Sequence, residues 1–163
     1  MAVRPLRVMP DDDVVLRTPA AAIPRVTDGI RTLARDLLET MRAHKGVGLA
    51  APQIGCGLQM FVTKPVEDHP QLIVINPRLE AGAGRAAVVE GCLSIPEVWE
   101  EIPRWARVRL HGCDLTGRPI RLEAEGLLAI VIQHEVDHLQ GRLISDPHAH
   151  RRLRHGRLCG AQP

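Results

Sequence analysis

Two histidines and a glutamate stand close together late in the chain, at His134, Glu135 and His138. On an α-helix, positions i and i+4 lie on one face, about 6 Å apart along the axis, so both imidazoles can bind one metal ion. Glu135 lies about 100° round the helix from His134 and can reach a water held by that ion. A general base beside a Lewis acid indicates metal-assisted hydrolysis.

The residues around this motif argue against a chance match. Residues 127–132 are all apolar, which predicts a helix buried on every side. A buried helix has little reason to carry two histidines and a glutamate unless a bound group satisfies them. We therefore interpret the motif as a metal site, although the same pattern also occurs by chance.

A catalytic metal site needs a third protein ligand and one open coordination position. Known downstream arrangements do not provide that ligand: Ile144 occupies the place of the third histidine of metzincins, and Glu135 is the last glutamate in the chain. The later histidines lie in a polar tail and are expected to be solvated: His148, His150 and His155. Cys92 is the best upstream candidate, because it follows Gly91 and a thiolate binds Zn²⁺ or Fe²⁺ strongly. A small buried core residue is the alternative for Cys92.

These residues must be positioned by a small set of helices and strands. Apolar residues recur at helical spacing over 30–41 after a capping Thr27, which predicts an amphipathic helix that ends at Lys45-Gly46. Short strands are predicted at 59–63, 72–76, 86–89, 107–110 and 120–122, the last two joined by a turn at 114–117. The buried helix is predicted over 125–140. This order favours an α+β fold of antiparallel strands, with a buried helix carrying HExxH and one further N-terminal amphipathic helix.

Length and composition limit the class of protein. The chain has 163 residues, of which 45% are hydrophobic and 25% charged, and this suits one globular domain with one core. We expect a single catalytic domain over 1–146 and a short, basic, flexible tail over 147–163. A net charge of +2 and only 2% aromatic residues argue against a DNA-binding protein or one that stacks bases on aromatic rings.

The cysteines and the apolar segments indicate the cellular compartment in which the protein is expected. Four cysteines are far apart and form no CxxC pair: Cys56, Cys92, Cys113 and Cys159. Arginine, proline and aspartate interrupt residues 1–13, so no apolar signal segment is expected there, and no apolar run approaches the ~18 residues that span a bilayer. We therefore expect free thiols, a reducing cytoplasmic compartment and no membrane partner.

Three segments together resemble the signature motifs of the peptide deformylase family: residues 46–53 (GVGLAAPQ), 90–94 (EGCLS) and 133–139 (QHEVDHL). Their order and separations also fit, and the resemblance extends from about residue 10 to Asp146. It implies hydrolysis of the N-formyl group from formylmethionine at the start of newly made bacterial peptides. It also implies antiparallel β-sheets around the metal-bearing helix and one divalent ion, physiologically Fe²⁺, which Zn²⁺ or Ni²⁺ can replace.

The resemblance carries roles onto the matching positions. It implies that Cys92, His134 and His138 hold the ion. Glu135 would take a proton from a water on that ion as the water attacks the formyl carbonyl, and would later return it to the departing amine. Two further donors would stabilise the oxyanion together with the metal: the side-chain amide of Gln53 and the backbone N–H of Leu93.

The resemblance also implies a peptide site. The substrate would bind in an extended form beside the segment around 47–48, with the methionine side chain in an apolar pocket. The matching positions are Val47, Gly48, Val88, Ile130 and Val131. Plain core packing is the alternative for the apolar side chains among them. Trp99 stands where many members have a basic residue, which leaves the preference for later peptide residues open.

Outside the reacting groups, the resemblance implies supporting residues and a partner. Glu90 would steady the metal ligands, and Asp137 would pair with Arg104, with a solvated helix charge as the alternative for Asp137. Many members continue into a C-terminal helix implicated in ribosome docking. Here the basic residues within 148–157 would contact ribosomal RNA electrostatically or form a solubilising end.

Two other functions stay open from the sequence. A different HExxH metallopeptidase, acting on internal bonds, would use the same helix, although Ile144 and the missing downstream glutamate count against it. A non-enzymatic metal-binding module would have four protein ligands and would leave Glu135 without a role.

Overall fold

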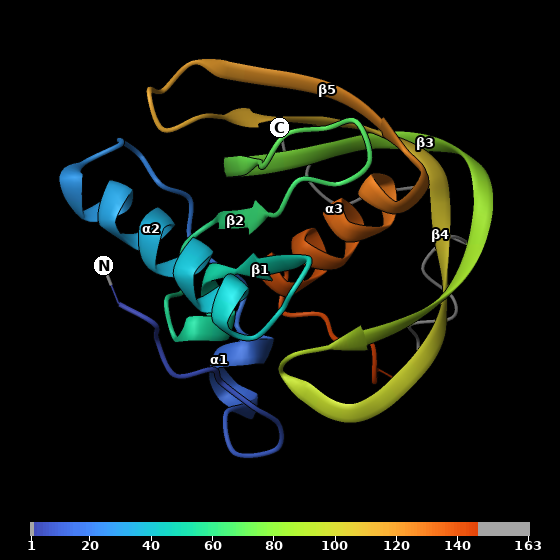
Figure 1. Cartoon of the computed structure of the whole chain (residues 1–163), viewed down its shortest axis with the longest axis horizontal. Helices are drawn as coiled ribbons and strands as arrows, with labels where there is room; N and C mark the ends of the chain where they lie inside the picture. Colours follow the sequence, from blue (N-terminus) through green and yellow to red (C-terminus); the bar gives the residue numbers. More distant parts are fainter. Residues whose placement is uncertain (1, 147–163) are drawn as a thin grey trace.

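The computed structural model describes residues 2–146, so the predicted tail at 147–163 lies outside the described residues. The elements are α1 (Asp13–Arg17), α2 (Asp28–Ala43), β1 (Gly48–Ala50), the 3₁₀ turn η1 (Ala51–Ile54), β2 (Met60–Thr63), β3 (Ile73–Cys92), β4 (Ile95–Cys113), β5 (Pro119–Glu125) and α3 (Gly126–Leu139). The strands form one antiparallel sheet in the order β1-β2-β3-β4-β5 (Figure 1). The predicted α+β class with antiparallel strands is therefore confirmed. In the described part of the chain, no helix is long and apolar enough to cross a membrane.

The helix α2 forms where the sequence predicts an amphipathic helix, but it ends earlier. The Thr27 side chain accepts a hydrogen bond from a first-turn N–H at 3.4 Å and caps the helix. The last helical residue is Ala43, and Lys45 adopts the left-handed conformation (φ 55°), one position before the glycine that usually does so. Gly46 lies in a crowded place, because a Cβ there would lie 3.1 Å from the Leu93 side chain, which would have to shift by a few tenths of an ångström.

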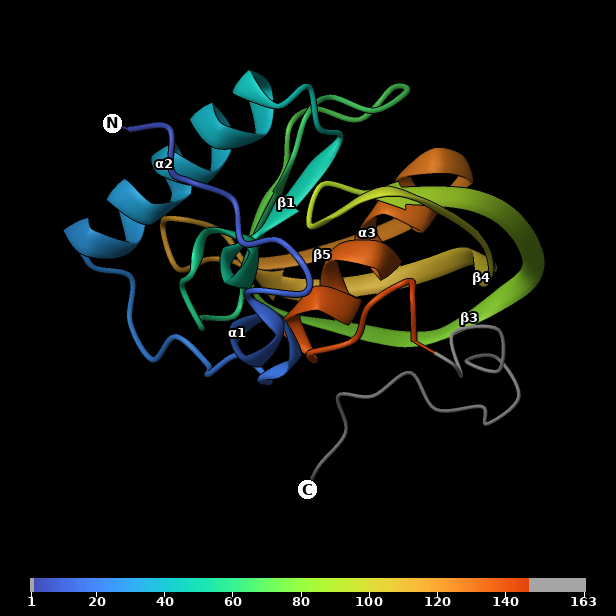
Figure 2. The ribbon, with the colours of Figure 1, turned by 90° about the horizontal axis from the view of Figure 1, so that it is seen from below.

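The long β3–β4 hairpin replaces several of the predicted short strands. The predicted strands at 72–76 and 86–89 fall in the single 20-residue strand β3 (Ile73–Cys92). β-Bulges between them accommodate the extra residues, so the strand continues. Pro77 lies within one register shift and Gly82 within the next, where a Cβ would lie 2.4 Å from the Trp105 side chain. Figure 2 shows β3 and β4 curving past α3, so the bulges shape the sheet around that helix.

The turn of this hairpin is anchored to the N-terminal part of the chain. The register pairs Cys92 with Ile95, so Leu93 and Ser94 form the turn. The Met9 N–H donates a hydrogen bond to the Ser94 carbonyl at 2.9 Å. A small buried cluster, to which the short helix α1 contributes, packs against Cys92: Leu16, Ile95, Ile102, Leu143 and Ile144. The sequence predicted no helix before Thr27, so it anticipated neither α1 nor this support for Cys92.

The helix α3 contacts all five strands and forms the centre of the main core. Five of its buried apolar residues pack in one cluster with Phe61, Val74 and Leu110: Leu128, Ala129, Ile132, Val136 and Leu139. Burial of each large aliphatic side chain stabilises the fold by about 1.5–3 kcal/mol. The prediction of burial on every side is wrong at Leu127, whose side chain is exposed. The rest of α3 holds residues 134–138 in a rigid frame.

Candidate active site

Three metal-binding side chains meet where the β3–β4 turn approaches α3. The Sγ atom of Cys92 lies 3.2 Å from His138 Nε2, and that nitrogen lies 3.2 Å from His134 Nε2. One donor atom from each residue lies within 4.8 Å of the others, and within residues 2–146 no fourth His, Cys, Asp or Glu joins the group. The fold thus brings together Cys92 and His138, which are 46 positions apart in the sequence.

Glu90 and Arg104 hold His134 in this orientation. Glu90 Oε2 lies 2.8 Å from His134 Nδ1, which directs Nε2 toward the other two side chains of the cluster. Arg104 donates to both Glu90 oxygens at 2.6 and 2.8 Å and to Asp137 at 2.5 Å. Burial opposes ionisation of Glu90, but the contacts with Arg104 and His134 outweigh it and lower the pKa to about 2. The predicted Asp137–Arg104 pair is confirmed, and Glu90 stays charged to orient the imidazole.

The charge of the cluster favours a bound cation. Burial alone would lower the pKa of His134, but hydrogen bonds with Cys92 and Glu90 and the nearby Glu135 raise it to about 10. A metal ion binds the neutral imidazole and therefore displaces this proton, and the acidic groups that favour the proton also favour a cation in its place. One thiolate and two imidazoles suit Fe²⁺, Zn²⁺ and Ni²⁺, and the residues present therefore fit a divalent metal.

Glu135 lies beside the cluster with its carboxylate buried against β1. Burial raises its pKa to about 7, because little water solvates the charged form. Among the described residues, its Oε2 atom has no hydrogen-bond partner. A Cβ at position 48 would lie 2.4 Å from Glu135 Oε1, so Gly48 leaves the space that this carboxylate occupies. A carboxylate that titrates near neutral pH can both accept and return a proton.

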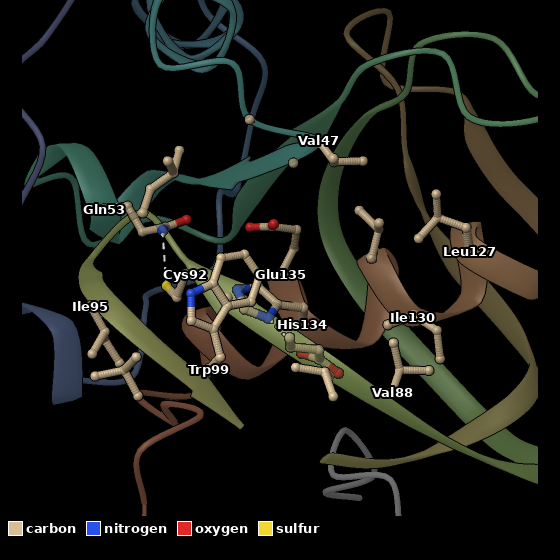
Figure 3. A pocket seen from close by; sticks show the side chains of 18 of the residues that line it. Val47, Gln53, Val88, Cys92, Ile95, Trp99, Leu127, Ile130, His134 and Glu135 are labelled. Carbon is tan, nitrogen blue, oxygen red and sulfur yellow. Dashed lines mark hydrogen bonds and ion pairs between the residues drawn. The ribbon is translucent and has the colours of Figure 1, made fainter. Parts of the chain in front are cut away.

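Gln53 projects toward the cluster from η1. Its Oε1 accepts a hydrogen bond from the Ala50 N–H at 2.9 Å, which leaves Nε2 facing the cluster. Nε2 lies 3.8 Å from Cys92 Sγ (Figure 3). It also lies 3.2 Å from Ser94 Oγ. The Arg7 N–H donates to the Gln53 carbonyl at 2.8 Å and ties η1 to the N-terminal segment. The buried Ser94 belongs to the motif at 90–94 but was assigned no role from the sequence, because its contact with Gln53 joins residues 41 positions apart.

A pocket of about 410 Å³ opens beside these groups (Figure 3). All the residues assigned to the peptide site line it: Val47, Gly48, Val88, Ile130 and Val131. Leu93 lines it as well, and so do the apolar residues Val89 and Leu127, which the sequence did not single out. The hydrophobic pattern of a sequence cannot identify such residues, because apolar residues at a pocket rim and in a core give the same pattern.

Residues 3–154 match the family model described as polypeptide deformylase. The chain belongs to the peptide deformylase family. It is 44% identical over 148 residues to the peptide deformylase of Alkalilimnicola ehrlichii, across 90% of this chain and 82% of that one. It is 43% identical over 153 residues to the peptide deformylase of Thermomicrobium roseum, across 90% of this chain and 86% of that one.

Solved peptide deformylase structures share this fold. The structure from Thermotoga maritima matches with a TM-score of 0.82 and 36% identity, across 88% of this chain and 96% of that one. The structure from Synechococcus elongatus, in complex with actinonin, matches with a TM-score of 0.80 and 43% identity, across 86% of this chain and 78% of that one. Peptide deformylases are metal-dependent hydrolases, and Cys92, His134 and His138 form the candidate metal site of this member.

The close contact between Gly48 and Glu135 predicts a specific effect on deformylation. Gly48→Ala should lower kcat about 100-fold, because the added methyl group pushes the Glu135 carboxylate out of place. The metal content should not change, since neither residue belongs to the ligand cluster. Gly57→Ala is the matched control, because a Cβ there meets no atom within 4 Å. Equal rates for the two variants would contradict this arrangement.

The buried ion pairs of Arg104 predict a large effect on stability. Arg104→Met should lower the free energy of unfolding by about 3–5 kcal/mol, because it leaves the Glu90 carboxylate buried without its cation. Arg109→Met removes two ion pairs that are partly exposed and should cost far less. Urea unfolding of both variants measures the difference, and similar midpoints for the two would refute the argument.

Proposed function

We propose that this deformylase removes the formyl group from formylmethionine at the N-terminus of newly made peptides, with Cys92, His134 and His138 as metal ligands. One observation carries the proposal: the sulfur of Cys92, the imidazoles of His134 and His138, and the buried Glu135 side chain meet beside one apolar pocket. A non-enzymatic metal module would have four protein ligands, whereas this cluster has three within the described residues.

Each residue around the cluster has a separate role in hydrolysis. A divalent ion bound there, which we propose is Fe²⁺ physiologically, would supply Lewis acidity that polarises the formyl carbonyl. Glu135 accepts the proton of the attacking water and returns it to the departing amine. The Gln53 Nε2 group and the Leu93 backbone N–H donate to the oxyanion as it develops. Glu90 keeps the ring of His134 in place during this change of charge.

The pocket explains why methionine is accepted. The peptide lies extended beside Val47 and Gly48, where backbone groups of β1 can hydrogen-bond to it. The methionine side chain enters among Val88, Ile130 and Val131. An unbranched thioether fits an irregular apolar space well, and its burial contributes about 1.5–3 kcal/mol to binding.

A formate-release assay tests the proposal. The protein is purified without oxygen, its metal content is measured, and the same sample is given formyl-Met-Ala and a longer unformylated peptide. We expect formate from the first and no cleavage of the second. Cleavage of internal bonds in the unformylated peptide would support a different metallopeptidase. Metal-loaded protein that releases no formate would refute the deformylase assignment.

We also propose that the enzyme meets its substrates in the cytoplasm, as they leave the ribosome. The support is the sequence of the tail, where residues 148–157 include Arg151, Arg152, Arg154 and Arg157. Arginines near an RNA surface bind phosphate in a salt-dependent way. Ribosome pull-down at two salt concentrations, with and without residues 147–163, tests this. Equal recovery of both forms at low salt would exclude a role for the tail.

A further inference from the structure

Three exposed apolar side chains gather at the deformylase pocket. Among residues 2–146, the exposed large hydrophobic residues are Val3, Val14, Val89, Trp99 and Leu127. Val89, Trp99 and Leu127 all line the pocket, with 59%, 70% and 47% of their surface exposed. Exposed apolar side chains scattered singly need no explanation, but a group at the rim of a binding pocket indicates a surface that a ligand covers.

The neighbouring glycine shapes the position of the Trp99 indole. Trp99 pairs with Gly91 across the β3–β4 ladder. A Cβ at Gly91 would lie 2.8–3.0 Å from three atoms of the six-membered ring, so the indole rests where that side chain would be. The ring therefore lies across β3 at the residue directly before Cys92. Figure 3 shows it among the side chains of the pocket, with Ile95 nearby in the view.

The geometry of an extended peptide indicates which residue reaches this ring. Successive side chains of an extended chain point to opposite sides. If the methionine side chain points toward Val88 and Ile130, the next side chain points away from them. In Figure 3, Val88 and Ile130 lie on one side of the pocket, while Trp99 and Ile95 lie on the other.

We propose that Trp99 determines specificity for the second residue of the formylated peptide and favours a large apolar or aromatic side chain there. This inference rests on the proposed function and names its substrate class more closely. The flat indole face offers a broad apolar contact that stacking or aliphatic packing can fill. Glu97, which also lines the pocket, makes an acidic side chain at this position unfavourable.

Kinetics with paired substrates test the inference. For wild-type enzyme, kcat/KM should be about tenfold higher with formyl-Met-Phe-Ala than with formyl-Met-Gly-Ala. Trp99→Ala should remove this difference mainly through KM, and should change the glycine substrate by less than about twofold. Trp99→Phe should keep part of the preference. Val14→Ala is the control, because Val14 is exposed outside this pocket and should change neither rate.

Binding supplies a second measurement that does not depend on turnover. Addition of the product peptide Met-Phe-Ala should shift the tryptophan emission of wild-type enzyme to shorter wavelength as the indole is buried. Trp99→Phe, in which Trp105 remains, should show no such shift.

The possible results separate the two proposals. Failure of wild-type enzyme to release formate from either peptide would overturn the proposed function. Equal rates on both peptides, or a preference that Trp99→Ala leaves intact, would overturn only the role of Trp99. If a large apolar third residue, as in formyl-Met-Gly-Phe, raised kcat/KM instead, Trp99 would contact the third residue of the peptide and the assignment to the second residue would be wrong.

Discussion

Glu135→Gln is expected to lower kcat for formate release by about 10²–10⁴-fold, the range that general acid–base catalysis contributes. Glutamine has the size and shape of glutamate but cannot accept the proton of the attacking water. The ligand cluster consists of Cys92, His134 and His138, so the metal content should be unchanged. Initial rates with formyl-Met-Ala and metal analysis of the same sample measure both quantities.

A second glutamate, at the N-terminal end of α3 and away from the metal cluster, gives the control for this variant. Glu125 is exposed, precedes α3 and makes no capping hydrogen bond through its side chain, so Glu125→Gln should keep full activity. Full activity in Glu135→Gln would show that another group moves the proton. Loss of the metal together with activity would mean that Glu135 supports the site instead of taking part in the chemistry.

Cys92→Ala is expected to lower both metal content and deformylation, with kcat reduced by at least about 10³-fold. A Lewis acid supplies several kcal/mol of transition-state stabilisation, and each 1.4 kcal/mol corresponds to a factor of ten. Removal of the metal from the wild-type enzyme by a chelator should cause a similar loss. Addition of Fe²⁺, Zn²⁺ or Ni²⁺ should then restore the wild-type enzyme and not the variant.

The other described cysteines provide matched controls. Cys56 and Cys113 are free and lie outside the ligand cluster, so Cys56→Ala and Cys113→Ala should keep the metal and the activity. Stoichiometric metal and normal turnover in Cys92→Ala would show that the Cys92 sulfur is not a metal ligand. Metal loss in all three variants alike would indicate a general effect on folding.

The sequence predicted the helical part of the site well because helical spacing is local. Two histidines four positions apart share a face in any α-helix, so His134 and His138 could be assigned before the fold was known. The apolar run before them predicted burial, and α3 contacts every strand of the sheet. Cys92 required elimination of downstream ligands and then a family resemblance, because nothing local connects a hairpin turn to a helix 46 positions away.

The sequence predicted the strands less well, because a proline or glycine that ends a strand cannot be told from one that lies in a β-bulge. Pro77 and Gly82 fall between the predicted strands at 72–76 and 86–89, yet β3 continues through both and bends. That bend depends on pairing with β4 and on Trp105 packing over Gly82, which are contacts between distant parts of the chain. Contacts between distant segments also give Ser94 and Leu127 their places, because Ser94 lies 3.2 Å from Gln53 Nε2 and Leu127 lines the pocket.

The amino-acid sequence by itself determined the chemical groups, the helix that carries most of them and the family to which the chain belongs. Only the tertiary structure decided the contacts that give those groups their properties. Burial makes Glu135 a carboxyl group with a pKa of about 7, and Glu90 and Arg104 orient His134. The physical reason is that residue type and helical spacing are local, whereas desolvation, ion pairing and the fit of Glu135 against Gly48 depend on which distant segments meet.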